Sequence, residues 1–230
     1  MKKKLVLNYH ENIDFLNSKI YLNNINYWQK FWLDHNTVNE FAIPTEYFAK
    51  ILNLLSLAKV VNILDLACGN GDKTIELVKR NFKVTGIDIS ELAIGQALTR
   101  GQQLDLEVDF DCSDILDMPY AYASFDAVIA FFILEHLTFN LAKHLVQQLK
   151  SIIMPGGYFI TAIRQNYPDL ENSQVLEDKT LVSNDRLTQG MFYFQYNNSS
   201  INELFQNWQI HEQITISNDV LLIIAKNFQP

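Results

Sequence analysis

From residue 61 onward, short apolar runs alternate with stretches of helical periodicity. β-Branched and other apolar residues predict five strands, at residues 61–67, 82–88, 106–112, 125–132 and 158–163. Apolar residues at helical spacing predict the helices between them, at residues 72–81, 91–103 and 139–154. Pro155, Gly156 and Gly157 are expected to end the last of these helices. Strands that alternate with helices form a mostly parallel sheet with helices on both faces.

The C-terminal part of the chain adds a helix and a hairpin to this pattern. A helix is expected to begin at Ser199 or Ser200. Two strands follow at residues 211–217 and 220–226, joined by a turn at residues 218–219. With the five preceding strands they predict an α/β fold, a three-layer sandwich with a seven-stranded, mostly parallel sheet and a C-terminal antiparallel hairpin.

The first 60 residues differ from the rest in being rich in asparagine and aromatic residues. Pro44 suits the first turn of a helix, and apolar residues follow it at helical spacing. The chain shows no internal repeat, low-complexity tract or linker. We therefore expect residues 1–60 to form a helical cap over the active site of a domain at 61–230, all within one structural domain.

Composition narrows the classes of partner. The formal net charge of −8 and the pI of about 5.1 disfavour binding to nucleic-acid phosphates. No apolar run approaches the length of a membrane span. Neither Cys68 nor Cys112 belongs to a CxxC motif or a Cys/His cluster, so we expect no metal site and no disulfide. These features favour a cytoplasmic protein that acts on a small molecule.

Acidic residues and glycines gather where the first two predicted strands end. Asp65 ends the first strand, and Gly69 and Gly71 form a turn in which the backbone can approach a ligand closely. Asp88 ends the second strand, 17 residues after Gly71, where a carboxylate can accept hydrogen bonds from two ribose hydroxyls. Cofactor sites that bind NAD and those that bind S-adenosylmethionine both use such an acid.

The glycine pattern and the charges separate these two cofactors. A dinucleotide fingerprint requires a third glycine, and Thr74 stands there instead. Asp65, together with Asp72 at the start of the following helix, would repel a pyrophosphate. S-Adenosylmethionine has no phosphate, and its ammonium and sulfonium groups favour nearby carboxylates. The pattern therefore favours the methyl donor.

Five segments, in order between about residues 61 and 165, resemble the motifs of the class I methyltransferase family. They are DLACGNG, GIDIS, SDILDMPY, FDAVIAFFILEHL and LKSIIMPGGYFI. Ala67 stands where many members have the first glycine of the glycine motif. The resemblance implies a Rossmann-like fold and S-adenosyl-L-methionine as cofactor.

The resemblance also assigns roles to single residues. Asp65, with the turn formed by Ala67, Cys68, Gly69 and Gly71, would surround the methionine part of the cofactor. Asp88 would contact the ribose, and Asp114 would contact the adenine amino group. Ile89 and the Ile115 amide would contact the adenine ring. The Ala130 carbonyl would contact the cofactor's ammonium group.

Two residues are candidates for binding or deprotonating the methyl acceptor. His136, just after the fourth strand, could act as a general base, with Glu135 beside it, or could hydrogen-bond locally at a helix start. Arg164, after the fifth strand, could bind an anionic acceptor or be an exposed loop residue. The aromatic residues that could wall this pocket are Phe131, Phe132, Tyr167, Tyr193 and Phe194. The chain lacks the [DNS]-P-P-[YF] and Pro-Cys motifs of base-methylating enzymes, which again favours a small-molecule acceptor.

Trp28 and Trp32 match a Trp-x-x-x-Trp pattern near the start of the thiopurine S-methyltransferase group. The chain length and a late aromatic segment are similar to the tellurite-resistance methyltransferases. These resemblances imply that Trp28 and Trp32 close over the cofactor, whereas the alternative is that they only pack a helix on the domain. Residues 166–190 depart from both groups and leave the substrate open. A cofactor-binding protein without turnover, and a nicotinamide oxidoreductase, remain as alternative functions.

Overall fold

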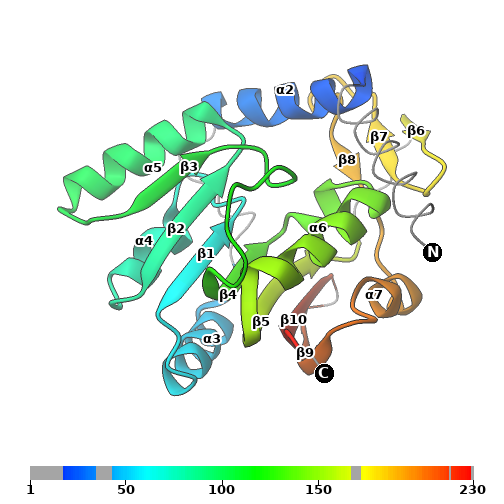
Figure 1. The fold of residues 1–230 in the computed structure, drawn as a ribbon. Coiled ribbons are helices and arrows are strands. Elements are labelled where there is room, and N and C mark those ends of the chain that lie inside the picture. The colour runs from blue at the N-terminus through cyan, green and yellow to red at the C-terminus, as the bar shows by residue number, and fades with distance from the viewer. Residues whose placement is uncertain (1–17, 35–42, 167–171, 218, 229–230) are drawn as a thin grey trace.

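The computed structural model describes residues 18–34, 43–166, 172–217 and 219–228. Its centre is the predicted seven-stranded sheet, in the order β3-β2-β1-β4-β5-β10-β9 (Figure 1). The strands are β1 (Asn62–Leu66), β2 (Lys83–Asp88), β3 (Asp109–Cys112), β4 (Phe125–Phe131), β5 (Ile153–Arg164), β9 (Gln209–Ser217) and β10 (Val220–Lys226). Strands β1 to β5 pair in parallel, and β10 pairs antiparallel to both β5 and β9. The expected Rossmann-like α/β sandwich with a C-terminal hairpin is confirmed.

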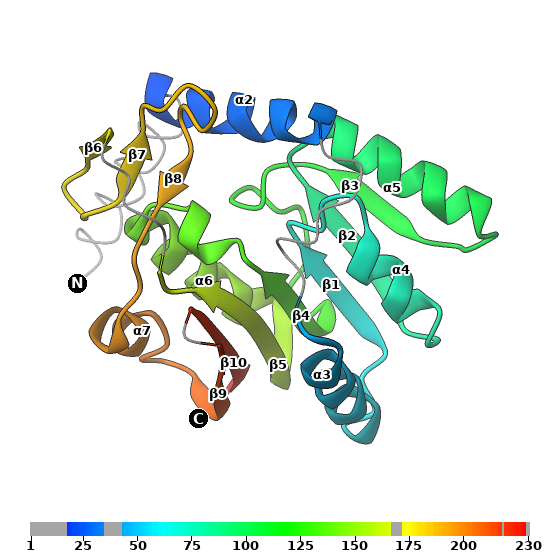
Figure 2. The same ribbon diagram turned by 180° about the vertical axis from the view of Figure 1, so that it is seen from behind.

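Helices cover both faces of the sheet. On one face, α6 (Phe139–Ile152) and α7 (Asn198–Leu204) bury their apolar sides against the sheet. On the other face, α3 (Thr45–Leu57) and α4 (Asp72–Val78) do the same. Helix α6 therefore lies in front of the sheet in Figure 1, and α3 lies in front of it in Figure 2. Helix α5 (Glu91–Gln103) follows β2 and packs against α2, β2 and β3.

The expectation that Pro155, Gly156 and Gly157 separate a helix from a strand is wrong. Strand β5 begins at Ile153, directly after α6, and contains all three residues. A β-carbon on Gly157 would lie 2.5 Å from the Asp126 carbonyl oxygen, so the two backbones pass very close here. The sheet register shifts in β4 at the same point. These residues form an irregular start of the strand rather than a loop.

The start of α7 also differs from expectation by one or two residues. Asn197, and not a serine, caps the helix: its side chain accepts a hydrogen bond from the Ser200 amide at 3.0 Å. The Ser200 hydroxyl accepts one from the Asn197 amide at 2.9 Å, which completes a capping box. Of the predicted hairpin turn, Asp219 is described, and Asn218 lies outside the described residues.

Two elements lie over the carboxyl ends of the parallel strands. One is α2 (Lys19–Asp34), and the other is a small antiparallel sheet of β6 (Ser173–Val175), β7 (Leu181–Ser183) and β8 (Phe192–Tyr193). Asn24 of α2 donates a hydrogen bond to the Gly190 carbonyl at 3.1 Å and so joins the two elements. The small sheet is not apparent from the sequence. No helix among the described residues is long and apolar enough to cross a membrane.

Candidate active site

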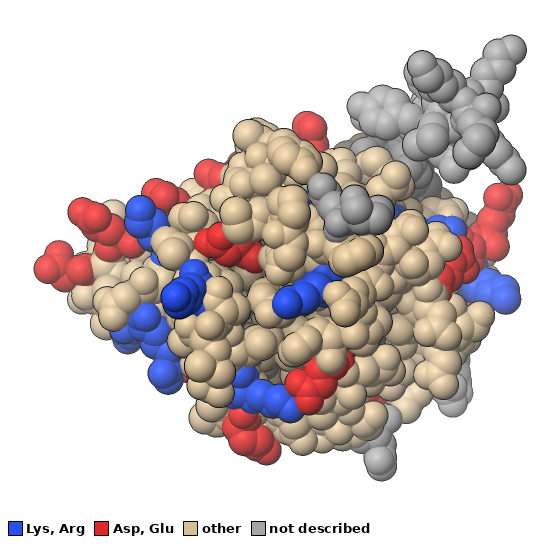
Figure 3. All heavy atoms as spheres, turned by 60° about the horizontal axis from the view of Figure 1, so that its bottom comes forward, with Lys and Arg blue, Asp and Glu red and all other residues tan. Residues whose placement is uncertain are grey.

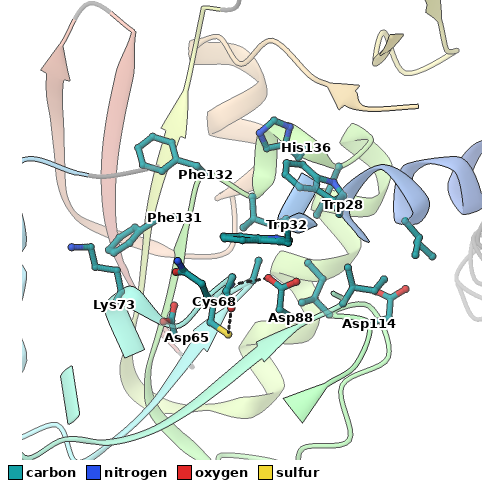
Figure 4. Close-up of a pocket in the computed structure, with 18 of the residues that line it drawn as sticks. Trp28, Trp32, Asp65, Cys68, Lys73, Asp88, Asp114, Phe131, Phe132 and His136 are labelled. Carbon is teal, nitrogen blue, oxygen red and sulfur yellow. Dashed lines mark hydrogen bonds between the residues drawn. The ribbon is translucent and has the colours of Figure 1, made fainter. Parts of the chain in front are cut away.

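A pocket of about 360 Å³ lies at the carboxyl ends of the central strands, beneath α2. Ligands of open α/β sheets bind at this edge. Of the cofactor-site residues that the sequence predicts, those that line it are Trp28, Asp65, Ala67, Cys68, Gly69, Asp88, Ile89, Asp114 and Ile115. Figure 4 shows Asp65, Asp88 and Asp114 following one another along the pocket.

The two glycines of the turn after β1 have different surroundings. Gly69 lines the pocket with φ of +54°, and a β-carbon there would lie 2.5 Å from the Trp32 ring. Gly71 does not line it: a β-carbon there would lie 2.9 Å from Ala97 Cβ and from the Phe110 ring. Gly71 therefore permits close packing of the turn against α5 and β3, while Gly69 permits close contact of the turn with the Trp32 ring.

Two residues of the same turn that are not glycines also face the pocket. Ala67 has φ of +57°, in the region that favours glycine, which explains why many class I members have a glycine there. Burial, with the nearby Asp65 and Asp88 carboxylates, raises the pKa of the Cys68 thiol well above its usual range. Cys68 is therefore a neutral thiol and not a reactive nucleophile.

Asp88 is buried at the end of β2, and the backbone holds its carboxylate in place. Its Oδ2 accepts a hydrogen bond from the Gly69 amide and its Oδ1 accepts one from the Ser90 amide, both at 2.9 Å. Burial raises the pKa of Asp88, and these two hydrogen bonds oppose the rise. Each carboxylate oxygen retains acceptor capacity for a ligand hydroxyl.

Asp65 is buried at the end of β1 and accepts a hydrogen bond from the Thr74 hydroxyl at 2.5 Å. Burial raises its pKa to about 7, an effect that Asp88 reinforces and that Thr74 and Lys73 oppose. A cationic ligand group beside Asp65 would therefore lower this pKa and gain a strong electrostatic partner.

Asp114 follows β3 and is hydrogen-bonded to a residue of α2, a pairing that the sequence does not indicate. Its Oδ2 accepts a hydrogen bond from the Tyr21 hydroxyl at 2.7 Å, and its Oδ1 accepts one from the Leu116 amide at 2.9 Å. Burial, with the Asp114 charge, raises the pKa of Tyr21. A second polar contact from α2 joins the Gln29 side chain to the Ile89 carbonyl at 2.9 Å. Helix α2 thus bonds to segments on which the cofactor site is predicted.

His136 lines the pocket from the short helix η1 (Leu134–His136) and is 2% exposed. Its Nδ1 lies 3.2 Å from the Phe192 carbonyl oxygen, so Nδ1 carries the proton, because a carbonyl can only accept. The ring lies between Trp28 and Tyr193, at centroid distances of 4.9 and 5.4 Å. Burial lowers the pKa of His136 to about 4, so the ring is neutral at physiological pH with Nε2 unprotonated.

Other predicted residues lie away from the pocket lining. Ala130 is fully buried in β4, and its carbonyl accepts a hydrogen bond from the Thr161 hydroxyl at 2.7 Å. The Arg164 guanidinium lies 5.6 Å from the centre of the Phe132 ring, and its backbone amide donates to Glu135 Oε1 at 2.9 Å. Glu135 is fully buried and does not line the pocket either.

The aromatic residues expected around the acceptor divide into two groups. Phe131 and Phe132 line the pocket. Tyr193 contacts the His136 ring, and Phe194 stacks on Phe139 in the core. Tyr167 lies outside the described residues. The side of the pocket beside β4 is therefore apolar and aromatic.

A family model described as a methyltransferase domain matches residues 63–157, the part of the chain that carries the three aspartates and the glycine turn. These residues belong to a methyltransferase domain. Among curated proteins, the domain is similar to 27-O-demethylrifamycin SV methyltransferase from Amycolatopsis mediterranei (strain S699). The two are 33% identical over 130 residues, which are 55% of this chain and 47% of that protein. The chain spans about half or less of the length of the curated relatives it matches.

Solved structures share the fold of this methyltransferase domain. The 1,6-didemethyltoxoflavin-N1-methyltransferase of Burkholderia thailandensis, solved with S-adenosylhomocysteine, has a TM-score of 0.62 at 14% identity, with 84% of this chain and 94% of that chain covered. TehB from Haemophilus influenzae has a TM-score of 0.58 at 16% identity, with 87% and 66% covered. At sequence identities this low, these TM-scores show a common fold alone.

Proposed function

We propose that this protein binds S-adenosyl-L-methionine and transfers its methyl group to a small-molecule acceptor. The observation that carries the proposal is the row of three carboxylates, from Asp65, Asp88 and Asp114, in one pocket beside the glycine turn. The methyl donor bears a sulfonium and an ammonium group and no phosphate. An acidic lining therefore attracts it and would repel the pyrophosphate of a dinucleotide.

In this proposal each carboxylate takes a separate part of the cofactor. Asp88 accepts hydrogen bonds from the ribose hydroxyls, and Asp114 accepts one from the adenine amino group. Ile89 and Ile115, which directly follow the two acids in the sequence and line the pocket, pack on the adenine ring. Asp65 attracts the ammonium group. The methyl-bearing sulfonium would then lie near the glycine turn, facing the aromatic side of the pocket.

The cofactor site also needs protection from water, because methyl transfer is an in-line displacement that water can intercept. Trp28 and Trp32 of α2 lie over the pocket and are suited to close it around the bound cofactor. Their aromatic rings would exclude water while leaving the β4 side open to an acceptor.

The acceptor would bind beside β4 and η1, where Phe131, Phe132 and His136 line the pocket. His136 is neutral at physiological pH, so its Nε2 can accept a hydrogen bond from an acceptor hydroxyl, amine or thiol and orient it, while the pKa of about 4 makes the ring a weak base. Its protonated Nδ1 is held by the Phe192 carbonyl, which fixes the ring. Arg164 can assist only indirectly, because its guanidinium contacts Phe132 and does not line the pocket.

Two further features support a small-molecule acceptor in the cytoplasm. The formal net charge of −8 does not suit a phosphate backbone, and on the face shown in Figure 3 basic side chains are interspersed with acidic ones. Cys68 and Cys112 are free thiols, as a reducing compartment requires.

Calorimetric titration with S-adenosylmethionine and S-adenosylhomocysteine tests the proposal, with Asp88→Asn as the matched variant. We expect micromolar binding to the wild-type protein and a loss of at least about tenfold in the variant. Wild-type protein that binds neither ligand would refute the proposal. Mass spectrometry of phenols, amines and thiols incubated with S-adenosylmethionine then tests turnover. Binding without any methylated product would favour a cofactor-binding protein.

A further inference from the structure

One cationic side chain lines the pocket among the described residues, and it is Lys73. The acidic side chains on the same lining are Asp65, Asp72, Glu76, Asp88 and Asp114. His136 adds no positive charge, because burial keeps it neutral. Among the side chains of this lining, Lys73 is therefore the one that can attract an anionic ligand group by its charge.

Lys73 directly precedes Thr74, the residue that is hydrogen-bonded to Asp65. It belongs to the first turn of α4, and the following residue, Thr74, donates its hydroxyl to Asp65. Lys73 and Asp65 lie at the same end of the pocket in Figure 4, opposite Asp114. The positive charge of Lys73 acts on Asp65 through space and lowers its pKa. An acidic and a basic residue thus line the same end of the pocket.

The present contacts of Lys73 leave it able to bind a ligand. Its ammonium lies 3.3 Å from Glu76 Oε2 and 4.3 Å from the centre of the Phe48 ring. The pair with Glu76 joins neighbouring turns of one helix, and its two side chains are 26% and 38% exposed, so it contributes little stability. An ammonium group has three donors, and the pair with Glu76 uses one of them. The Phe48 ring contacts the ammonium through a cation–π interaction, which uses no hydrogen-bond acceptor.

We propose that Lys73 binds the carboxylate of the methionine part of S-adenosylmethionine, while Asp65 faces the ammonium group of the same part. An α-amino acid presents opposite charges on neighbouring atoms, and the Asp65–Lys73 pair offers the matching charges from one end of the pocket. Without Lys73, the ligand carboxylate would face Asp72 and Glu76 and be repelled. This inference rests on the proposed function and identifies the residue that selects a cofactor with an intact amino acid end.

A comparison of two ligands in four proteins tests the inference. The ligands are S-adenosylmethionine and decarboxylated S-adenosylmethionine, which differ only in the carboxylate. The proteins are wild type, Lys73→Met, Lys73→Arg and Lys79→Met. Methionine retains a long, flexible side chain without the charge, and arginine retains the charge. Lys79, an exposed residue at the end of the same helix, controls for the loss of one positive charge. Dissociation constants from calorimetry need no acceptor and no turnover.

We expect wild type, Lys73→Arg and Lys79→Met to bind S-adenosylmethionine about tenfold or more tightly than its decarboxylated form. Lys73→Met should bind the two ligands equally, through a weaker affinity for S-adenosylmethionine alone. If Lys73→Met still discriminates between them, or weakens both equally, the inference is wrong and the proposed function stands. If the wild-type protein binds neither ligand, both proposals fall.

Discussion

Trp32 lies so close to Gly69 that a β-carbon on Gly69 would be 2.5 Å from Trp32 Cζ2. Real β-carbons do not approach other atoms this closely, and Gly69 also has φ of +54°, which disfavours any other residue. The indole of α2 and the turn after β1 thus form one contact surface within the pocket (Figure 4). Any change that separates them changes the shape of the proposed cofactor site.

Gly69→Ala should therefore disturb both folding and binding. The added methyl group forces Trp32 away and strains the turn, so we expect the free energy of unfolding to fall by about 1–3 kcal/mol. Affinity for S-adenosylhomocysteine should fall at least about tenfold. Gly95→Ala is the matched control, because a β-carbon there meets nothing within 4 Å on an exposed turn of α5. It should stabilise the helix by about 0.5–1 kcal/mol and leave binding unchanged. Equal behaviour of the two variants would contradict the assigned role of Gly69.

Tyr21→Phe should weaken cofactor binding by removing the hydroxyl that orients Asp114. We expect a loss of about fivefold in affinity for S-adenosylhomocysteine and of about 1 kcal/mol in stability, as for one hydrogen bond. Tyr120→Phe provides the comparison, because Tyr120 donates to Asp111 at 2.6 Å outside the pocket lining. It should lose similar stability and retain full affinity. Affinity that is unchanged or higher in Tyr21→Phe would mean that Tyr21 does not position Asp114 for the ligand.

The acid range offers a test of two buried groups whose effects on stability oppose each other. His136 has its pKa lowered from 6.5 to about 4, so the unfolded state binds more protons between these values and stability falls on acidification. Asp65 has its pKa raised from 3.8 to about 7, so the folded state binds more protons there and stability falls as pH rises. In the wild-type protein the two slopes largely cancel between pH 4 and 6.5.

Single substitutions should expose each slope in denaturant unfolding measured across this range. In His136→Gln only the protonation of Asp65 still acts, so the stability of this variant should fall as pH rises, by on the order of 3 kcal/mol between pH 4 and 6.5. In Asp65→Asn only the protonation of His136 still acts, so the stability of this variant should rise with pH by a similar amount. Parallel pH profiles for the two variants would contradict the burial-driven shifts in both groups.

The parts of the fold that the sequence predicts depend on local patterns. Strands β1, β2 and β4 are short apolar runs, and Asp65 and Asp88 are placed simply by ending them. Parallel strands bring their carboxyl ends together, so spacing along the chain was enough to expect one pocket. Strands of two or three residues, such as those of the small sheet over the pocket, carry too little pattern to be predicted.

What could not be predicted depends on contacts between distant segments. Tyr21 meets Asp114 across 93 residues, and nothing near either residue indicates the pairing. Gly71 serves packing rather than the pocket because Ala97 and Phe110, from two later elements, occupy the space beside it. The Ala130 carbonyl accepts a hydrogen bond from the hydroxyl of Thr161 on the neighbouring strand, a partner that the sequence does not indicate. Such positions follow from the packed structure, and local motifs do not reveal them.

Cofactor binding should release protons if Asp65 receives the ammonium group of the methionine part. With a pKa of about 7, Asp65 is mostly protonated at pH 6.5, and a cation beside it would lower that pKa. The ligand's own amino group is already charged at this pH and takes up few protons, since α-amino pKa values are about 7.7–8.0. The release is measured as the dependence of the binding enthalpy on the ionisation enthalpy of the buffer.

We expect the wild-type protein to release about half a proton or more per S-adenosylmethionine bound at pH 6.5. Asp65→Asn should release almost none and should bind more weakly, since the neutral amide offers the ammonium no opposite charge. His136 cannot account for the effect, because it is already neutral well below this pH. Net proton uptake by the wild-type protein, or an equal release from Asp65→Asn, would place the ammonium group elsewhere in the pocket. Asp65 and Lys73 would then not bind the amino acid end of the cofactor together.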